Sequence, residues 1–516
     1  MKRARRAGTL DAIGLEVMAH AFEGLAEEMG AVLVASAVSP NVREWRDSSA
    51  ALFDAGGEII TQTTHIPVHL GAMPDAVAAV MALDPGPGDT FVLNDPFTGG
   101  THLPDITMVH AVELNGAVAG YTVVRAHHSD VGGMRPGSMP PHSTDIFQEG
   151  LVLPPVRWAV AGAVQDDVRR LVLANVRTPE MRAHDLAAQQ AACVRGAERY
   201  REMAARHGAR YVAGAVRDLL AYAERRTRRS LAERVRPGVY AAEDWLEGDG
   251  TTEDDLAIRV RVEVTREGGF RCDFSGTDAA ARGNVNCPIS VTRSAVLFVV
   301  RCLVDDDIPT NGGLQRAVTL TAPAGTLVNA TWPHAVVAGN VETSQRITDT
   351  LFLALAGVRG VPAQGQGTMN NILFGAPGWT YYETLGGGQG GSAQADGPSG
   401  VHVGMSNTRN TPVEVFELEH PLRIRTYALR RASGGAGRGR GGEGVVREYE
   451  ALTEIEGSLL TERRRHAPRG ARGGGDGAPG RNLLNGRPLG ARAAVTLHPG
   501  DVLRIETPGG GGYGEK

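Results

Sequence analysis

The densest group of residues capable of chemistry lies between Asn94 and Asp145. Two short runs in it, THLPD and RAHHSD, bring imidazole and carboxylate groups together about 25 residues apart. The side chains that could bind a cation are His102, Asp105, His127, His128 and Asp130. Such a set suits a first-row divalent metal if the two runs converge across neighbouring strands. The alternative is that these side chains only cap turns, because Asn-Asp-Pro and Gly-Gly-Thr-His are ordinary loop sequences.

His102, Asp105 and His127 are the predicted ligands of one divalent ion. His102 and Asp105 belong to one loop after a Gly-Gly turn, and Pro104 limits the conformations open to the pair. His127 ends the next predicted strand but one, which an antiparallel sheet could place beside that loop. Two imidazoles and one carboxylate suit Zn²⁺, Mn²⁺ or Fe²⁺, so the sequence does not select the metal.

Asp95, His128 and Asp130 are predicted to orient the ligands or to act as a base on bound water. Metal-bound imidazoles usually donate their second N–H to a carboxylate or a carbonyl, so acidic neighbours are expected. Because His128 directly follows a predicted ligand, its side chain would point to the opposite face of a strand. Asp95 is therefore favoured over His128 as the residue that orients the ligands or acts as the base.

A second pair of histidines, His65 and His69, lies in the run HIPVHL. A spacing of four would place both on one face of a helix, but Pro67 between them favours an extended or turning segment. We therefore interpret both as residues that line a substrate pocket rather than as metal ligands.

The run AGNVETSQRITD is a third polar set. Asn340 or Thr343 could cap a helix, which would leave Glu342, Gln345 and Arg346 at or near its first turn. The run could be a capped surface helix. Alternatively, its polar side chains face a pocket, and on that interpretation Asn340, Glu342 and Gln345 bind substrate.

The charged residues and glycines exclude several classes of protein. The only lysines are Lys2 and Lys516, so an internal Schiff-base lysine and a Walker-type phosphate lysine are both excluded. The net charge of −5 gives no reason to expect nucleic acid or an anionic membrane as a partner. The glycine-rich run from Gly386 to Gly397 lacks the lysine and spacing of a nucleotide-binding loop, although its amides could form an anion nest.

Several features favour a cytoplasmic protein. The four cysteines contain no C-x-x-C pair and fit a reducing compartment without structural disulfides. The basic start MKRARR precedes a segment that Asp11, Glu16 and Glu23 interrupt, so no secretory signal is expected. The longest uncharged apolar stretch, Met29 to Val42, is too short to span a bilayer.

The pattern of apolar residues predicts an α+β protein with an N-terminal part at 1–235 and a larger β-rich part at 236–516. In the first part, residues 10–33 repeat apolar side chains at every fourth position, as a helix does. Residues 89–130 favour strands with a hairpin turn at Asn115-Gly116.

Further elements follow along the chain. Residues 164–235 are predicted to be helical, with Thr178 as an N-cap before Pro179. Residues 258–264 alternate apolar and charged side chains, which is typical of a strand with one wet face. Two more helices are expected at about 291–304 and 343–356, followed by strands and glycine-rich loops.

Long ordered motifs along the chain resemble the hydantoinase B/oxoprolinase family. They include HIPVHLGAMPDAV, NDPFTGGTHLPDITMV, NVRTPEMRAHDL, DFSGTD, AVVAGNVETSQRITD, YYETLGGGQGG, SGGAGRGRGGEGVVRE and TPGGGGYG. The resemblance covers ATP-dependent hydantoin-hydrolysing enzymes, 5-oxoprolinase and the α-type subunit of acetone and acetophenone carboxylases. It also points to His102, Asp105 and His127 as the metal ligands.

This resemblance implies a division of labour within a hetero-oligomer. A hydantoinase A-type subunit would use ATP to phosphorylate the substrate's oxygen, and the present chain would bind the metal and complete the reaction. The expected reaction is hydrolysis of the C–N bond of a cyclic amide, such as a hydantoin, 5-oxoproline or a related lactam (EC 3.5.2.-). The alternative is an ATP-dependent ketone carboxylase, which would join a phosphorylated enol to CO₂.

Overall fold

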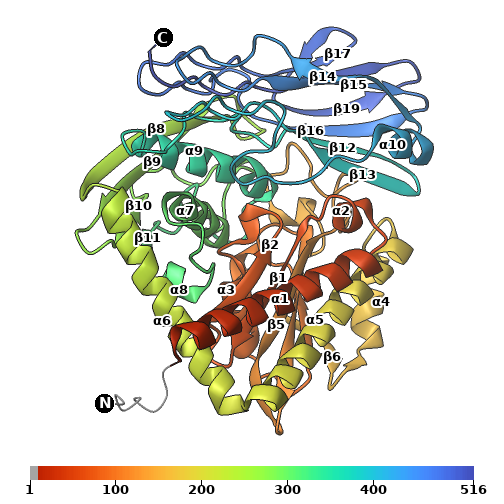
Figure 1. Ribbon diagram of the computed structural model, residues 1–516. Coiled ribbons are helices and arrows are strands. Elements are labelled where there is room, and N and C mark those ends of the chain that lie inside the picture. Colours follow the sequence, from red (N-terminus) through yellow and green to blue (C-terminus); the bar gives the residue numbers. More distant parts are fainter. Residues whose placement is uncertain (1–9, 516) are drawn as a thin grey trace.

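The computed structural model describes residues 10–515 and has mixed α and β content, as predicted (Figure 1). The N-terminal part contains one antiparallel sheet of seven strands in the order β2-β1-β5-β4-β3-β6-β7. The strands are β1 (Ser48–Asp54), β2 (Ile59–Thr64), β3 (Thr90–Leu93), β4 (Asp105–Leu114), β5 (Ala117–His127), β6 (Val156–Val160) and β7 (Ala163–Val164). The predicted hairpin turn between β4 and β5 is confirmed, since Asn115 and Gly116 both have positive φ.

Helices cover both faces of this sheet because its central strands are buried on both sides. Leu52, Met108 and Val124 face one hydrophobic core with α1 (Ala12–Ser36) and α5 (Pro179–His207). Phe53 and Val123, one residue away on the same strands, face a second core with α3 (Met73–Met81). The alternation follows from the two-residue period of a strand.

The predicted N-terminal helix is confirmed as α1, which begins after its N-cap Asp11. Its buried stripe differs from the predicted repeat, because Ile13 and Val17 are 77% and 56% exposed while Phe22 is fully buried. Residues spaced four apart do not stay on one face of a helix that has 3.6 residues per turn. The predicted apolar positions in the first turns of α1 therefore face away from the sheet.

The helical region at 164–235 divides into three helices, α4 (Asp166–Ala174), α5 and α6 (Ala209–Arg234). Pro179 opens α5 as expected, but the side chain of Thr178 makes no capping hydrogen bond. Gly208, with φ of 89°, separates α5 from α6. No sheet among residues 10–515 combines strands from both sides of residue 235, and the division into two parts there stays a prediction.

The C-terminal part holds three sheets and two long helices, α7 (Ile289–Leu303) and α9 (Ser344–Ala354), which lie between the N-terminal sheet and the last two sheets (Figure 1). The first sheet contains β8 (Gly238–Glu247), β9 (Asp255–Val264), β10 (Phe270–Asp273) and β11 (Val318–Thr321). The second contains β12 (Asn371–Ala376), β13 (Trp379–Thr384), β16 (Ile455–Leu460) and β19 (Arg492–Leu497). The third contains β14 (Leu422–Arg430), β15 (Gly444–Ala451), β17 (Arg481–Leu484), β18 (Arg487–Leu489) and β20 (Val502–Glu506).

Short elements complete the fold. They are α2 (Pro40–Arg43), α8 (Gly312–Gln315), α10 (Val413–Glu419) and four single turns, η1 (Pro67–His69), η2 (Pro96–Thr98), η3 (Ile146–Gln148) and η4 (Gly339–Thr343). Within residues 10–515, none of the helices combines the length and hydropathy that a membrane crossing requires.

The glycine-rich loops of the C-terminal part pack backbone against backbone. Gly388 N–H donates to Pro508 O and Gly391 N–H donates to Gly511 O, which joins two of the loops. A Cβ atom on Gly388 would lie 2.0 Å from Gly442 O and 2.2 Å from Gly510 N. These amides bond within the protein, which argues against the anion nest that the sequence left open.

A buried network of ion pairs joins three elements of the C-terminal part. Arg463, which follows β16, donates from Nη2 to Asp244 of β8 at 2.8 Å and to Asp349 of α9 at 2.5 Å. Arg346 of α9 lies 3.2 Å from Glu462 and 3.5 Å from Asp244. All five side chains are buried, so removing one cation would leave carboxylates without compensation in a low-dielectric interior.

Replacing Arg463 with methionine is expected to destabilise the protein by about 3–5 kcal/mol, because Asp244 and Asp349 would lose their shared cation. The matched control is Arg431→Met, since Arg431 is 81% exposed in its ion pair with Glu443 and such pairs contribute about 0–1 kcal/mol. Thermal unfolding of both variants measures the difference. Equal Tm values for the two variants would contradict the role assigned to the network.

Candidate metal centre

The pairing of two strands brings the predicted metal ligands together. Asp105 begins β4 and His127 ends β5, and these two residues are direct partners in the antiparallel register. His102 lies in the turn before β4, where its carbonyl accepts from the N–H of Asp105 at 3.0 Å. The three side chains are 0–2% exposed.

The loop before His102 can pack against helix α3 only with glycine at its turn. Gly99 has φ of 102°, and a Cβ there would lie 2.2 Å from Ala76 N. Arg125 of β5 holds this turn by donating from Nη2 to Gly99 O at 2.6 Å and from Nε to Thr107 Oγ1 at 2.7 Å. The Gly-Gly turn therefore sets the position of His102 relative to the strands.

Three potential ligand atoms converge on one point. His102 Nε2 and His127 Nδ1 each lie 3.1 Å from Asp105 Oδ1 and 3.2 Å from each other. Ligands bonded to Zn²⁺ at about 2.0–2.2 Å lie roughly 2.8–3.6 Å apart when the angles are between right and tetrahedral. The spacing and the nature of these donors thus fit one divalent ion among them.

Further side chains support Asp105 from its other oxygen. Thr101 Oγ1 donates to Asp105 Oδ2 at 2.5 Å, and His69 Nε2 lies 3.3 Å from the same atom. His69 is held in turn by Ser49 Oγ, 3.0 Å from its Nδ1. Although burial acts to raise it, the pKa of Asp105 lies well below its usual range because His102 and His69 favour the carboxylate.

The ligand atoms face a small cavity of about 10 Å³ that is lined by buried residues. Asp47 and Tyr382, which the sequence did not indicate, line it beside the three predicted ligands. Tyr382 stacks on His127 with ring centroids 4.8 Å apart. Asp47 makes no side-chain hydrogen bond to another described residue, and burial raises the pKa of its carboxyl to about 7. No motif in the sequence singled out either residue.

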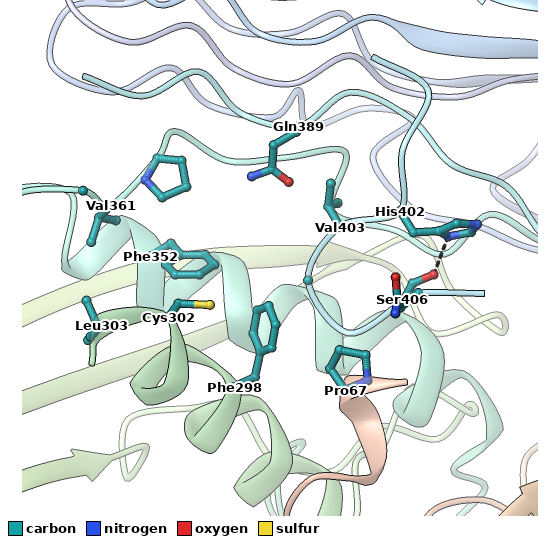
Figure 2. Close-up of a pocket in the computed structure, with 14 residues that line it drawn as sticks. Pro67, Phe298, Cys302, Leu303, Phe352, Val361, Gln389, His402, Val403 and Ser406 are labelled. Carbon is teal, nitrogen blue, oxygen red and sulfur yellow. Dashed lines mark hydrogen bonds between the residues drawn. The ribbon is translucent and has the colours of Figure 1, made fainter. Parts of the chain in front are cut away.

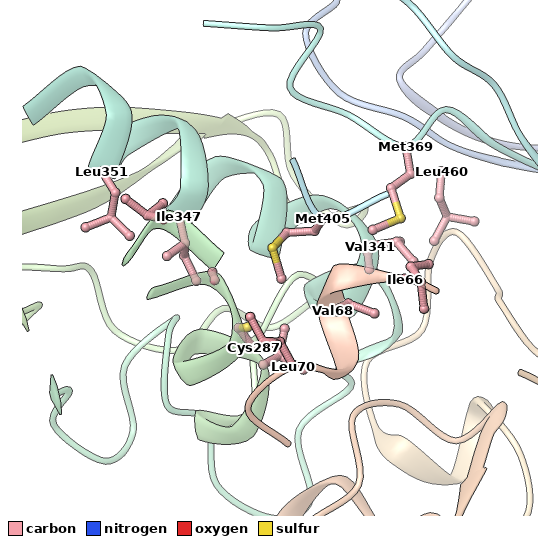
Figure 3. Close-up of a cluster of buried hydrophobic side chains, with 14 of the residues drawn as sticks. Ile66, Val68, Leu70, Cys287, Val341, Ile347, Leu351, Met369, Met405 and Leu460 are labelled. Atoms are coloured by element: carbon pink, nitrogen blue, oxygen red, sulfur yellow. The ribbon is translucent and has the colours of Figure 1, made fainter. Parts of the chain in front are cut away.

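Apolar residues seal the rest of this cavity. Its remaining walls include Ile66, Val68, Val341 and Met369, all of which are buried in the main hydrophobic core (Figure 3). Such walls exclude bulk water and strengthen electrostatic interactions inside.

The two predicted substrate histidines have different surroundings. His69 lines the metal cavity, and its imidazole contacts Asp105. His65 does not line that cavity; its ring lies beside Gly30 of α1, and its Nδ1 has no hydrogen-bond partner among residues 10–515. The structure therefore brings His69, but not His65, to the site.

His69 and His65 give a matched test of whether His69 stabilises Asp105 as a metal ligand. His69→Leu is expected to weaken metal affinity by about 10–100-fold, because groups that orient a ligand typically contribute this much. His65→Leu is the control and should leave affinity unchanged, and His69→Gln should restore part of the loss through its amide donor. Competitive titration against a chelator measures all three, and equal affinities for both leucine variants would exclude a role for His69.

The predicted polar run at 338–349 forms a π turn, η4, that continues into α9. Asn340 lines the metal cavity, and its Oδ1 is buried without a hydrogen-bond partner among the described residues. Single π turns are frequent at functional sites. The interpretation of this run as a surface helix is therefore wrong.

Glu342 and Gln345 lie behind the cavity rather than in it. Glu342 Oε1 accepts from Asn371 Nδ2 at 2.7 Å, and Asn371 Oδ1 accepts from Tyr382 Oη at 2.8 Å. Gln345 donates from Nε2 to Val403 O at 2.9 Å. In place of the predicted contact with substrate at the metal, Glu342 supports Tyr382 and Gln345 braces the segment around Val403.

Asp95 and Asp130 organise loops instead of contacting the metal cluster, contrary to the prediction. Asp95 caps η2 by accepting from Phe97 N–H at 2.9 Å. Asp130 accepts from Gly132 N–H, Gly137 N–H and Arg177. The two carboxylates accept hydrogen bonds from N–H groups of their surrounding loops. Their oxygens are therefore not directed at the predicted metal ligands.

His128 points away from the metal cluster, as the alternation of the strand required. Its Nε2 lies 2.8 Å from Oε1 of Gln189 on α5, and its backbone N–H donates to Pro104 O at 2.8 Å. Burial lowers the pKa of its ring to about 4. The predicted catalytic role of His128 is therefore replaced by a structural one.

The cysteines play no part in the cluster. Cys193, Cys272 and Cys287 are buried and free, and Cys302 is free and exposed. Burial raises the pKa of the Cys272 thiol above its ordinary value, which disfavours the thiolate that zinc requires. Among residues 10–515, His102, Asp105 and His127 form the only group of three such ligands that converges.

Comparisons with known proteins agree with the family that the sequence motifs resemble. 5-oxoprolinase 1 of Arabidopsis thaliana is 36% identical over 98% of this chain, although the chain spans only 42% of that protein. The B component of a putative D-/L-hydantoinase from a Pseudomonas species is 30% identical over 98% of this chain and 90% of that one. The crystal structure of ATP-dependent caprolactamase from Pseudomonas jessenii superposes with a TM-score of 0.91 at 28% identity, covering 98% and 92% of the two chains. A family model described as Hydantoinase B/oxoprolinase matches residues 11–516, and the chain belongs to this family.

Proposed function

We propose that this chain is the metal-binding subunit of an ATP-dependent cyclic-amide hydrolase, acting on a substrate that an A-type partner subunit phosphorylates. The convergence of His102, Asp105 and His127 in a small cavity lined by buried residues is the observation that carries the proposal. The names of three relatives, a 5-oxoprolinase, a hydantoinase component and a caprolactamase, support a cyclic amide as substrate. The absence of lysine between residues 3 and 515 supports ATP chemistry on a partner.

The reaction needs activation because amide resonance stabilises a lactam against attack by water. Phosphorylation of the amide oxygen by the partner would remove that resonance and expose the ring carbon to attack by water. The C–N bond would then break as the nitrogen takes up a proton, and a second water would hydrolyse the resulting acyl phosphate to the carboxylate and inorganic phosphate. His102, Asp105 and His127 would hold one divalent ion, Zn²⁺, Mn²⁺ or Fe²⁺. When bound, such an ion supplies a Lewis acid that stabilises developing negative charge and acidifies water.

Asp47 is placed to accept the proton from the attacking water. Its carboxylate lines the cavity that His102, Asp105 and His127 face, and the other described residues leave it without a side-chain hydrogen bond. Its backbone carbonyl accepts from His127 N–H at 3.0 Å, which fixes Asp47 beside the ligand. Asn340 faces the same cavity with an amide oxygen that has no hydrogen-bond partner among the described residues.

Substituting Asp47 with asparagine should keep the metal and lower ring opening by about 100-fold or more, because a positioned general base contributes about 10²–10⁴-fold. Metal content and single-turnover rates are measured on the same preparation. Asp54→Asn, at the other end of β1, is the control. An unchanged rate in Asp47→Asn would exclude the residue as the proton acceptor.

The experiment that tests the function uses the chain purified with its A-type partner. ADP and ring-opened product are measured with ATP and a panel of hydantoin, 5-oxoproline, 2-pyrrolidinone, ε-caprolactam and acetone. We expect ring-opened product from at least one cyclic amide, with no requirement for bicarbonate. Product from acetone that depends on bicarbonate, with no cyclic amide opened, would instead assign the chain to a ketone carboxylase.

A further inference from the structure

A second and much larger cavity of about 400 Å³ lies between α7, α9 and the loops that carry Pro67, Gln389 and His402 (Figure 2). Phe298 and Leu303 of α7, Phe352 of α9, and Val361 and Pro362 form apolar walls around it. This volume is in the range of small-molecule sites, whereas the metal cavity has room only for something the size of a water molecule.

One turn of the chain lines both cavities. In η1, Pro67 lines the large cavity while its neighbours Val68 and His69 line the metal cavity. Gly404 and Ser406 line the large cavity, and Met405 between them is buried in the same hydrophobic cluster as Val68 and Val341 (Figure 3). The two cavities are therefore both lined by η1, although no residue lines both.

One polar side chain enters this apolar space without a partner. Gln389 lines the cavity from the glycine-rich loop, and its carboxamide makes no hydrogen bond to another residue in the described part of the chain (Figure 2). A carboxamide presents one acceptor and a donor side by side. Because Gln389 is half-buried, its carboxamide is free to exchange water for a ligand that presents a matching donor and acceptor.

The other polar groups of the cavity are uncharged. His402 Nδ1 lies 2.5 Å from Ser406 Oγ, and burial lowers the pKa of His402 to about 4, so its ring is neutral at pH 7. The described residues that line the cavity include no Asp, Glu, Lys or Arg. A carboxylate on the ligand would therefore lose its hydration without gaining a charged partner.

We propose that this cavity binds an uncharged cyclic amide, whose N–H and C=O pair with the Gln389 carboxamide while its ring packs on Phe298 and Phe352. A small ring holds its amide cis, so the donor and the acceptor lie on one edge and match the edge of Gln389. An open-chain secondary amide is trans and presents them on opposite sides. The choice of a cyclic amide as ligand rests on the proposed function. What is added is the place where the ring binds and the exclusion of charged rings.

Cys302 provides a probe of occupancy that is independent of catalysis. It lines the same cavity and is the only exposed cysteine of the four. Alkylation by N-ethylmaleimide requires the thiolate and is followed at pH 8.5. The full chain is labelled alone, without ATP or partner, and Cys302→Ser confirms the site of labelling.

We expect 2-pyrrolidinone and ε-caprolactam to slow labelling of Cys302 by at least about tenfold at saturation. N-methylacetamide, which is open-chain and trans, and 5-oxoproline, which is anionic, should protect at least about tenfold less well. Gln389→Leu should raise the lactam concentration for half-protection by about 10–100-fold, because two hydrogen bonds are lost. Gln394→Leu, an exposed glutamine in the same loop, is the matched control.

Failure of protection by every lactam, or equal protection in Gln389→Leu and the wild type, would overturn the inference. Equal protection by 5-oxoproline and 2-pyrrolidinone would overturn the restriction to uncharged rings.

Unchanged thermal unfolding of Gln389→Leu shows that the variant is folded. Phe352→Trp, which fills the cavity, supplies a second test through loss of protection by ε-caprolactam. Ring opening by the complex without protection of Cys302 would refute this site alone. Protection without ring opening would refute the proposed function alone.

Discussion

Alanine in place of His102 or His127 is expected to remove the bound ion and to lower ring opening by about 1000-fold or more. Each substitution deletes one of three ligand atoms that lie 3.1–3.2 Å apart. A catalytic metal contributes several kcal/mol of transition-state stabilisation, and about 4 kcal/mol corresponds to a factor of 1000. Elemental analysis and the rate of product formation are measured on the same samples of the complex.

The matched control for this prediction is His128→Gln. His128 is the direct neighbour of His127 and equally buried, but it faces α5 and pairs with Gln189. The control should retain its metal and nearly all of its activity. Near-stoichiometric metal in His102→Ala or His127→Ala would refute the ligand set, and loss of metal in the control would show that the effect is not specific to the cluster.

The isolated, metal-loaded chain is expected to show no ATP hydrolysis and no opening of an unactivated lactam. The chain has no lysine between residues 3 and 515, and its glycine-rich loops bond to one another rather than forming an anion nest. Adding the A-type partner should restore both activities, by about 1000-fold or more over the chain alone. ADP release and product are measured with each protein alone and with the two together. Turnover of a lactam by the isolated chain at the rate of the complex would contradict the division of labour.

The convergence of the predicted ligands could be predicted in part, because they lie in two short runs whose strands pair directly. Counted from the hairpin at Asn115-Gly116, the register would place Asp105 opposite Ala126. A bulge between Val112 and Glu113 shifts the pairing by one residue, so that Asp105 opposes His127. The turn follows from local sequence, whereas nothing in the sequence indicated the bulge.

The roles of the neighbouring carboxylates could not be predicted in the same way. A carboxylate that caps a turn and one that binds a metal have the same chemistry and occur in the same kind of loop. Asp95 and Asp130 both accept from nearby backbone N–H groups, whereas Asp105 accepts from side chains. Only the three-dimensional path of the loop separates these cases.

The remaining walls of the site come from distant parts of the chain. Asp47 precedes β1, Asn340 belongs to η4 and Tyr382 belongs to β13, and no periodicity relates them to the ligands. The π turn at η4 was also not indicated, because a widened turn has the same composition as an ordinary capped helix. The sequence showed that the run is polar. Whether it lies on the surface or is buried depends on packing between α9 and the sheets around it.

Ring opening is expected to depend on one divalent ion held by His102, Asp105 and His127. The most direct test removes the metal from the complex with a chelator and then restores it in known amounts, while ring-opened product is measured at each level of metal content. We expect the rate to rise in proportion to bound metal and to reach its maximum at one ion per chain, with no recovery in His127→Ala. Ring opening at the full rate in the metal-free complex would contradict this expectation.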